Sequence, residues 1–182
     1  MMECAPILLI APDSSKGTYS VAEVAGAIAG GIRSAGTRID LPPVADGGEG
    51  TLAILVRALG DMIASPVVTG QFGLRVRARY GLLDGGSTAI IEATEACGLG
   101  LAPVGERDAE AASTCGVGEL TLHARSAGVQ RIVVTIGGSA TTADGQGALD
   151  AVRLGCVVNG VTVDVLCDAS VVFEDTDGVS GS

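Results

Sequence analysis

The chain has 182 residues, of which 47% are hydrophobic and 2% aromatic, and it carries a formal net charge of -10 at pH 7. This length and hydrophobic content allow a buried core, which Ala, Val, Ile and Leu must pack because aromatic residues are so few. The negative charge argues against duplex DNA or RNA as the main partner, since phosphate binding needs a concentrated positive surface. We see no apolar stretch near the roughly 20 residues that span a bilayer and no basic leader, so we expect a cytoplasmic protein without membrane contacts.

The cysteines give no sign of a disulfide framework or a metal site. Their number is odd, they are widely spaced, and no Cys-x-x-Cys pair occurs. We therefore expect reduced and mostly buried thiols. The five are Cys4, Cys97, Cys115, Cys156 and Cys167.

The first third of the chain predicts alternating strands and helices. Residues 7–11 form a continuous apolar run, typical of a strand buried on both faces. Ser20 and Glu23 make a capping-box pattern that predicts the start of a helix. A second strand over 39–44 and a second helix over 51–59 follow, and this order favours a parallel sheet with right-handed crossovers.

In the middle of the chain the hydrophobic pattern changes to a period of two residues. Apolar residues over 74–82 alternate with three arginines, and Asp84-Gly85 predicts a hairpin turn into a strand over 88–92. The arginines are Arg75, Arg77 and Arg79. Alternation of this kind is typical of any half-exposed strand, so we interpret them mainly as a solvated face, with anion binding as the alternative.

The remaining pattern completes a prediction of the α/β class. We expect a parallel-sheet first domain that is incomplete, with an inserted second α/β domain that contains the antiparallel hairpin. The expected later elements are a helix over 118–127, a strand over 131–136, a helix over 144–154 and a final buried strand over 161–166. The expected domains are residues 1–65, the first part of a Rossmann-like domain, residues 66–165, the second domain, and residues 166–182, a tail; the boundary lies near 62–71.

Two acidic, glycine-rich runs carry most of the functional information. Residues 43–51 and 136–145 each follow a predicted strand and precede a helix-like segment, where α/β proteins keep their ligand sites. Glycines let the backbone approach a ligand, and carboxylates can hold a cation or accept a proton. Asp46 and Glu49 could do this, or they could cap the following helix; the sequence favours neither.

A lysine lies in the first strand-to-helix loop. Lys16 follows two serines beside a predicted helix N-terminus, which is a suitable place for a phosphate or a carboxylate. The alternative is a surface turn with a solvated lysine. His123 is the only histidine and has no partner at a telling spacing, so we interpret it as structural.

Four ordered segments together resemble the bacterial glycerate kinase family. The segments are residues 11–17, 44–51, 113–120 and 136–141. The resemblance implies a two-domain α/β protein that transfers the γ-phosphoryl group of ATP, with Mg²⁺, to a hydroxyl of D-glycerate. The product in most members is 2-phosphoglycerate, and the implied partners are the small-molecule substrate and the nucleotide.

The resemblance also implies roles for individual residues. Lys16 would stabilise phosphate, Asp46 and Glu49 would be Mg²⁺ ligands or the base that accepts the hydroxyl proton, and the remaining positions would bind substrate or phosphate. These remaining positions are Asp13, Ser14, Gly47, Gly48, Gly137, Gly138 and Ser139.

The chain also departs from the family pattern. Family members are much longer, and their C-terminal half supplies a further motif to the cleft. Asp144 follows the fourth segment and is displaced by one residue relative to the aspartate of the family pattern. Asp168 resembles the aspartate that ends a strand in family members. We therefore expect poor or absent turnover and association into a homo-oligomer. One alternative is a non-catalytic binding or interaction protein that keeps the kinase fold, and another is an unrelated α/β domain that binds a sugar acid or a nucleotide.

Overall fold

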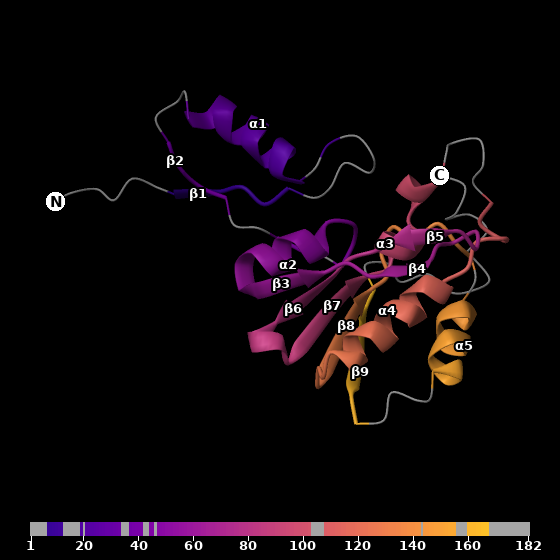
Figure 1. Cartoon of the computed structure of the whole chain (residues 1–182). Coiled ribbons are helices and arrows are strands. Elements are labelled where there is room, and N and C mark those ends of the chain that lie inside the picture. The colour runs from indigo at the N-terminus through magenta and orange to yellow at the C-terminus, as the bar shows by residue number, and fades with distance from the viewer. Residues whose placement is uncertain are drawn as a thin grey trace. The chain divides into compact units, whose positions relative to one another are not determined.

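The structure is a computed structural model of the chain (Figure 1). It describes residues 7–12, 19, 21–33, 37–41, 44–45, 47–102, 108–142, 144–155 and 160–167. The chain divides into two compact units, residues 1–45 and 46–182. No helix in these described ranges is both long and apolar enough to cross a membrane.

The first unit contains one helix and two short strands. Strand β1 (Ile7–Leu9) pairs in parallel with β2 (Arg38–Asp40), and helix α1 (Val21–Arg33) connects them. The parallel pairing confirms the strand, helix and strand order expected from the sequence. The expectation that the first strand is buried on both faces was wrong, because Ile7 and Leu9 are 57% and 61% exposed. The described part of this unit contains a single helix, α1, and one helix can cover only one face of a strand.

The second unit is built around a five-stranded mixed sheet with the order β3-β6-β7-β8-β9. Its strands β3, β6 and β7 are antiparallel neighbours, whereas β7, β8 and β9 run parallel. The strands are β3 (Gly60–Ala64), β6 (Tyr80–Leu83), β7 (Thr88–Glu92), β8 (Arg131–Thr135) and β9 (Thr162–Leu166). The mixed α/β class and the predicted hairpin, now β6 and β7 joined by the short helix η1 (Asp84–Gly86), are confirmed.

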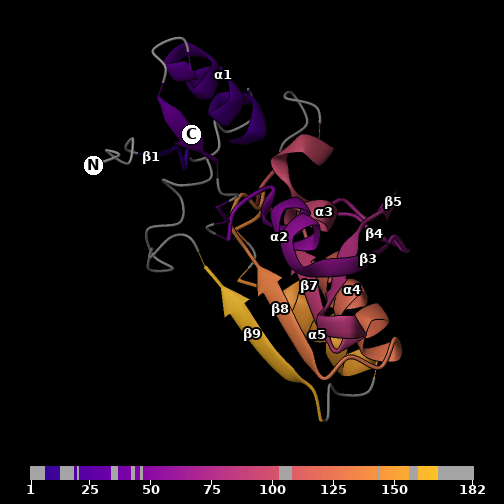
Figure 2. The ribbon, with the colours of Figure 1, turned by 90° about the vertical axis from the view of Figure 1, so that its left-hand side faces the viewer.

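Helices cover the two faces of this sheet. Helix α2 (Thr51–Leu59) contributes Leu52 to a small core with Leu83 and Ile90 on one face. Helix α4 (Cys115–Ser126) contributes Leu120 to the larger core on the other face, and α5 (Gln146–Leu154) packs against α4. Figure 2 shows α2 and α4 on opposite sides of the strands. The short helices α3 (Thr94–Cys97) and η2 (Leu99–Leu101) follow β7.

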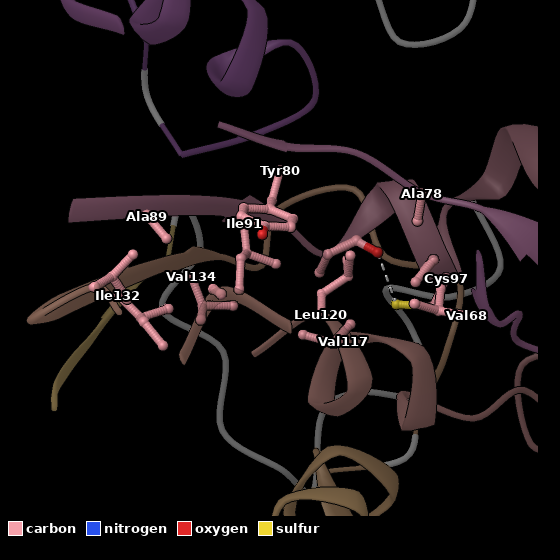
Figure 3. Packing of buried hydrophobic residues seen from close by; sticks show 14 of the residues in the cluster. Val68, Ala78, Tyr80, Ala89, Ile91, Cys97, Val117, Leu120, Ile132 and Val134 are labelled. Carbon is pink, nitrogen blue, oxygen red and sulfur yellow. Dashed lines mark hydrogen bonds between the residues drawn. The ribbon is translucent and has the colours of Figure 1, made fainter. Parts of the chain in front are cut away.

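The larger core consists mainly of small aliphatic side chains, as the composition requires. Ile91, Leu120 and Ile132 are fully buried between the sheet and α4 (Figure 3). Cys97 lies in the same cluster, and its thiol donates to the carbonyl of Ala93 at 3.2 Å. Burial raises the pKa of this thiol to about 11, so it behaves as a small apolar group.

The run over 74–82 contains two strands instead of one. Strand β5 (Arg75–Arg77) pairs with β4 (Val67–Thr69) in a separate two-stranded sheet, and the chain then enters β6 in the main sheet. The expectation of a buried strand over 161–166 was also wrong. Strand β9 is the edge of the main sheet, with Val163 43% and Val165 58% exposed.

The division between the units lies at 45/46, nearer the N-terminus than the boundary expected near 62–71. Helix α2 packs against β6 and β7, and the strand that follows it, β3, pairs with β6. These contacts place residues 51–64 with the sheet of the second unit.

Candidate functional site

The site lies at the carboxyl ends of the three parallel strands. The register places Glu92 of β7 beside Thr135 of β8, and Thr135 beside Leu166 of β9. Ligands of open α/β sheets bind at this edge, where strand-to-helix loops converge. Here the loop before α2 and the loop after β8 meet.

One backbone hydrogen bond and one close approach bring the two glycine-rich runs together. The amide of Gly137 donates to the carbonyl of Gly47 at 3.3 Å. Gly138 has φ +76°, and a Cβ built there would lie 3.2 Å from Thr94 Cγ2 and 3.8 Å from Glu49 Cβ. Gly47 has φ +98°. Only glycine adopts such a conformation at little cost, so both runs need glycine at these positions for the loops to meet.

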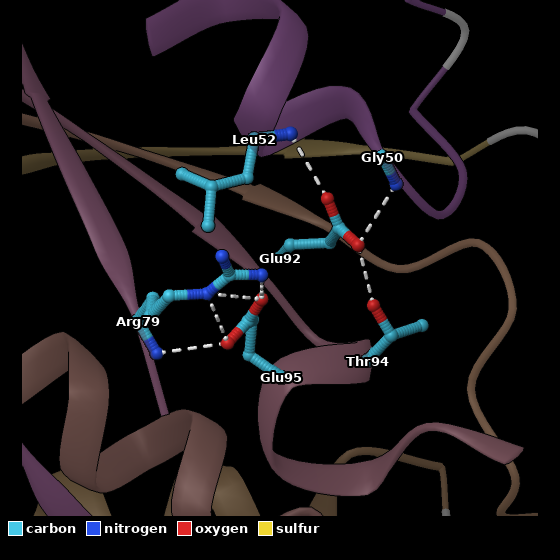
Figure 4. Close-up of polar contacts among 6 residues, drawn as sticks. All are labelled: Gly50, Leu52, Arg79, Glu92, Thr94 and Glu95. Atoms are coloured by element: carbon cyan, nitrogen blue, oxygen red, sulfur yellow. Dashed lines mark hydrogen bonds and ion pairs between the residues drawn. The ribbon is translucent and has the colours of Figure 1, made fainter. Parts of the chain in front are cut away.

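Glu92 caps the N-terminus of α2 from a distant strand. Its side chain accepts hydrogen bonds from the Gly50 amide at 3.0 Å, the Leu52 amide at 2.9 Å and the Thr94 hydroxyl at 2.6 Å (Figure 4). Glu92 is 4% exposed. This carboxylate satisfies amides that a helix start leaves without intrahelical partners and lies at the positive end of the helix dipole.

The sequence interpretation did not single out Glu92. An acid that ends an otherwise apolar strand, directly before a small helix, is the only signal that could have found it. Its partners lie about forty positions earlier in the chain, at sequence separations of 42 and 40 residues. The capping role considered for Glu49 thus belongs to Glu92, and Glu49 is exposed.

A partly exposed ion pair between Arg79 and Glu95 forms the neighbouring wall. The Nε of Arg79 donates to both oxygens of Glu95, at 3.0 and 3.1 Å, and Nη2 donates to Oε1 (Figure 4). The backbone amide of Arg79 also donates to Glu95, at 3.0 Å. These hydrogen bonds and the negative charge of Glu95 raise the pKa of Arg79 above its ordinary value. The guanidinium is therefore charged and held in one orientation.

These groups surround a pocket of about 370 Å³. Its polar and charged lining is Glu49, Arg77, Arg79, Glu92, Thr94 and Glu95, and residues of α2 and of the segment 98–101 complete it. The volume is within the range of small-molecule sites, and an apolar wall with a few charged groups is typical of them.

The segment 113–120 is used mainly for packing. The Thr114 hydroxyl accepts from the amide of Ala148 at 3.0 Å, which joins the starts of α4 and α5. A Cβ on Gly116 would lie 2.2 Å from the carbonyl of Thr69, and one on Gly118 would lie 2.4 Å from the carbonyl of Ala148. These glycines let α4 approach β4 and α5 closely.

Comparison with known proteins identifies the family. The family model described as "Glycerate kinase family" matches residues 8–166. The chain belongs to the glycerate kinase family. It is 45% identical over 146 residues to the glycerate kinase of Bacillus subtilis (strain 168), covering 79% of this chain and 38% of that protein. It is 40% identical over 156 residues to the glycerate 2-kinase of Escherichia coli (strain K12), covering 84% of this chain and 41% of that one.

A solved structure supports the fold. The crystal structure of a protein from Salmonella typhimurium LT2, provisionally named glycerate kinase 2, superposes with a TM-score of 0.62 at 42% identity, covering 82% of this chain and 40% of that one. The chain therefore spans about two fifths of the length of these glycerate kinase relatives.

The structure places only some of the predicted site residues. Within the glycerate kinase segments it brings Gly47 and Glu49 close to Gly137 and Gly138. Gly48 lies in the first of these loops, and Ser139, in the second, forms a bridge with Gly98. Asp144 is exposed just before α5. The residues outside the described ranges are Asp13, Ser14, Lys16, Asp46 and Asp168. Among the described residues, no cluster of three or more His, Cys, Asp or Glu side chains could hold a metal ion by itself.

Proposed function

We propose that the chain is a glycerate kinase homologue whose site serves the ATP-dependent phosphorylation of D-glycerate to phosphoglycerate. The observation that supports this most directly is the Gly137 to Gly47 hydrogen bond, which joins two family segments beside a pocket that Glu49 lines. Phosphoryl transfer depends mainly on positioning and on electrostatic stabilisation of the transferred group. Backbone loops at a sheet edge, with a few charged side chains, can supply both.

The acidic groups near the pocket differ in their fitness to bind Mg²⁺. Both oxygens of Glu92 already accept hydrogen bonds, whereas Glu49 is exposed and accepts none from the described residues. Mg²⁺ commonly takes one or two carboxylates and fills its other positions with water and substrate phosphates. We assign this role, or that of the base for the substrate hydroxyl, to Glu49 and Asp46. When bound, the ion would neutralise charge on the phosphoryl group.

Backbone amides and a lysine complete the proposed phosphate site. The amide of Gly137 donates to Gly47, so we assign phosphate contacts to the amides of Gly138 and Ser139 and to Lys16. We assign further substrate contacts to Asp13, Ser14, Gly47 and Gly48. Replacing Lys16 with Ala should weaken ATP binding in calorimetry and leave the thermal midpoint nearly unchanged, because lysine side chains are rarely buried and seldom contribute much to folding. Equal affinity in both proteins would remove Lys16 from the site.

A second candidate function is binding of the same ligands without turnover. The observation that favours it is that the chain covers only 38% and 41% of the two curated relatives described above. Binding a ligand makes weaker demands on geometry than phosphoryl transfer does, because misplacing the reactants raises the barrier to transfer. We further propose a cytoplasmic location and homo-oligomers.

A coupled assay of ADP release tests these two functions. The chain is incubated with ATP, Mg²⁺ and D-glycerate, with glycerol as the substrate control, and D-glycerate binding is measured in parallel by calorimetry. ADP release that requires D-glycerate supports the kinase, and binding without release supports the second candidate. Absence of both would contradict the proposed substrate.

A further inference from the structure

We propose that Arg77 and Arg79 form a carboxylate-binding subsite in the pocket that fixes the acid group of a small hydroxy acid. The proposal rests on the proposed function and adds to it the part of the molecule that recognises the acid. The three alternating arginines on this stretch are not equivalent. Arg77 and Arg79 line the pocket, whereas Arg75 donates to the Thr69 hydroxyl at 3.0 Å and to Glu119 at 3.2 Å.

Arg79 is held ready to bind an anion. Glu95, whose side chain is 14% exposed, takes hydrogen bonds from Nε and Nη2 of Arg79. The Arg79 side chain is 54% exposed, and Nη1 donates to no acceptor among the described residues. Because the ion pair already orders the guanidinium, a ligand that binds to the remaining N–H groups loses less side-chain entropy.

Arg77 is anchored in a similar way by the backbone. Its Nη1 donates to the carbonyl of Ser65 at 3.1 Å. This single contact leaves the other N–H groups of the guanidinium for a second partner. Two arginines that line one pocket match the planar geometry of a carboxylate, which guanidinium groups bind through paired hydrogen bonds.

The charge of the pocket favours a singly charged anion over a polyphosphate. Three carboxylates and two guanidinium groups line the pocket, which leaves one excess negative charge. The carboxylate of Glu92 accepts hydrogen bonds from two backbone amides, and that of Glu95 accepts them from Arg79. A monocarboxylate can be accommodated by the two arginines, whereas a triphosphate carries more negative charge than two guanidinium groups, one of them already paired with Glu95, can balance.

Thr94 offers a place for the hydroxyl group of such a ligand. Its own hydroxyl donates to Glu92 at 2.6 Å and lines the pocket. A hydroxyl whose proton is already donated can still accept a hydrogen bond through its oxygen. The pocket thus combines cations for the carboxylate with an acceptor for an adjacent alcohol, as an α-hydroxy acid requires.

Calorimetric titration with D-glycerate, lactate, glycerol and Mg²⁺-ATP tests this subsite on the full chain. The variants are Arg77→Met and Arg79→Met, with Arg75→Met as the matched control from the same stretch. Each of the first two should bind D-glycerate about tenfold more weakly or worse, since charge-assisted hydrogen bonds are lost. Arg75→Met should bind within about twofold of the wild type, and Mg²⁺-ATP affinity should be unchanged in all variants. Arg77→Met keeps the test valid if Arg79→Met leaves Glu95 unpaired and fails to fold.

The outcomes separate the subsite from the proposed function. Wild-type affinity for D-glycerate in both pocket variants, or equal affinity of the wild type for glycerol, overturns the subsite and leaves the function standing. Loss of Mg²⁺-ATP affinity with D-glycerate binding intact overturns the carboxylate assignment in favour of phosphate. Binding of lactate, but not D-glycerate, through the same arginines supports the subsite and contradicts the proposed substrate. No binding of any of these acids overturns both.

Discussion

At the scale of single residues, Glu92 and Glu49 line the same pocket but have different roles because their surroundings differ. Glu92 is 4% exposed and accepts three hydrogen bonds, two of them from the start of α2. Glu49 is exposed and accepts none from the described residues. The first side chain therefore supports the fold, and the second is available to a ligand.

Replacing each glutamate with glutamine should separate these roles. In Glu92→Gln one oxygen becomes an NH₂ group that faces a donor, so a buried amide loses its acceptor and the free energy of unfolding should fall by about 1–3 kcal/mol. Glu49→Gln should change it by less than about 0.5 kcal/mol, as for exposed positions generally. Urea unfolding followed by circular dichroism measures both. Equal costs for the two variants would contradict the capping role of Glu92.

Glu119 should make stability depend on pH. Burial acts to raise the pKa of its carboxyl group, but hydrogen bonds from Thr69 and the charge of Arg75 outweigh burial and leave that pKa below its ordinary value. A group whose pKa is lowered by folding stabilises the protein above its unfolded pKa, about 4.3 for Glu, and this contribution is lost as pH falls through the folded pKa.

The unfolding free energy of the wild type should thus fall more steeply below about pH 4.3 than that of Glu119→Gln. Denaturant unfolding over a series of acidic buffers measures the two slopes. Glu110→Gln, at an exposed position on the same unit, is the control and should follow the wild type. Parallel curves for the wild type and Glu119→Gln would show that the hydrogen bonds to Thr69 do not lower the pKa.

At the scale of elements, close approach of α4 and α5 requires glycine. A Cβ on Gly118 would lie 2.4 Å from the carbonyl of Ala148 and 2.7 Å from the Cβ of Ala151. Alanine normally favours helix over glycine by about 1 kcal/mol. In α4 the clash of an added Cβ with α5 should outweigh this helix preference of alanine. The backbone of α5 cannot move away from the Cβ as a flexible side chain could.

Gly118→Ala should therefore destabilise the protein, by about 1–3 kcal/mol, through overpacking. His123→Ala, at an exposed position on the same helix, should change the free energy of unfolding by no more than about 0.5 kcal/mol. Thermal and urea unfolding of both variants checks this. A more stable Gly118→Ala protein would mean that α4 and α5 are further apart than in the structure.

The local sequence pattern predicted where helices and strands lie better than it predicted how buried they are. The helix over 51–59, the hairpin into 88–92 and the strand over 131–136 were predicted because periodicity and turn residues are local signals. Strands β3 and β4 were missed because residues 60–69 carry no clear alternation. The burial of the strands before residue 12 and after residue 160 was predicted wrongly, since burial depends on how many strands and helices cover an element.

The same limit applied to the site. Glycines and acids in the two runs identified the loops that meet, because a strand-to-helix turn is a local pattern. The sequence interpretation treated Arg77 and Arg79 mainly as a solvated face. They are indeed exposed, but they also line the pocket, which only the positions of α2 and of residues 98–101 could reveal.

At the scale of the whole molecule, the main sheet of the second unit ends in an exposed edge. Strand β9 pairs only with β8 among the described strands, and Val163 and Val165 are 43% and 58% exposed. An unpaired, apolar edge strand favours pairing with a further chain. We therefore expect a second copy of the chain to associate at this edge.

Light scattering after size-exclusion chromatography tests this association. The wild type should show dimers or larger species whose proportion rises with concentration, and Val165→Lys should shift the distribution toward monomer because a charge on an edge strand opposes pairing. His123→Lys, at an exposed position away from β9 in the sequence, is the control. A monomeric wild type at high concentration would contradict the expectation.

The proposed function requires the two glycine-rich loops and Glu49 to form a magnesium-dependent site for phosphoryl transfer. The most direct measurement is a thermal-shift titration with Mg²⁺ and ATP, with and without D-glycerate, on the wild type, Glu49→Gln and Asp46→Asn. We predict a ligand-induced rise in the wild-type midpoint that requires Mg²⁺ and is lost in at least one variant, while the midpoints without ligand differ little. Identical ligand-induced shifts in all three proteins would contradict this proposal.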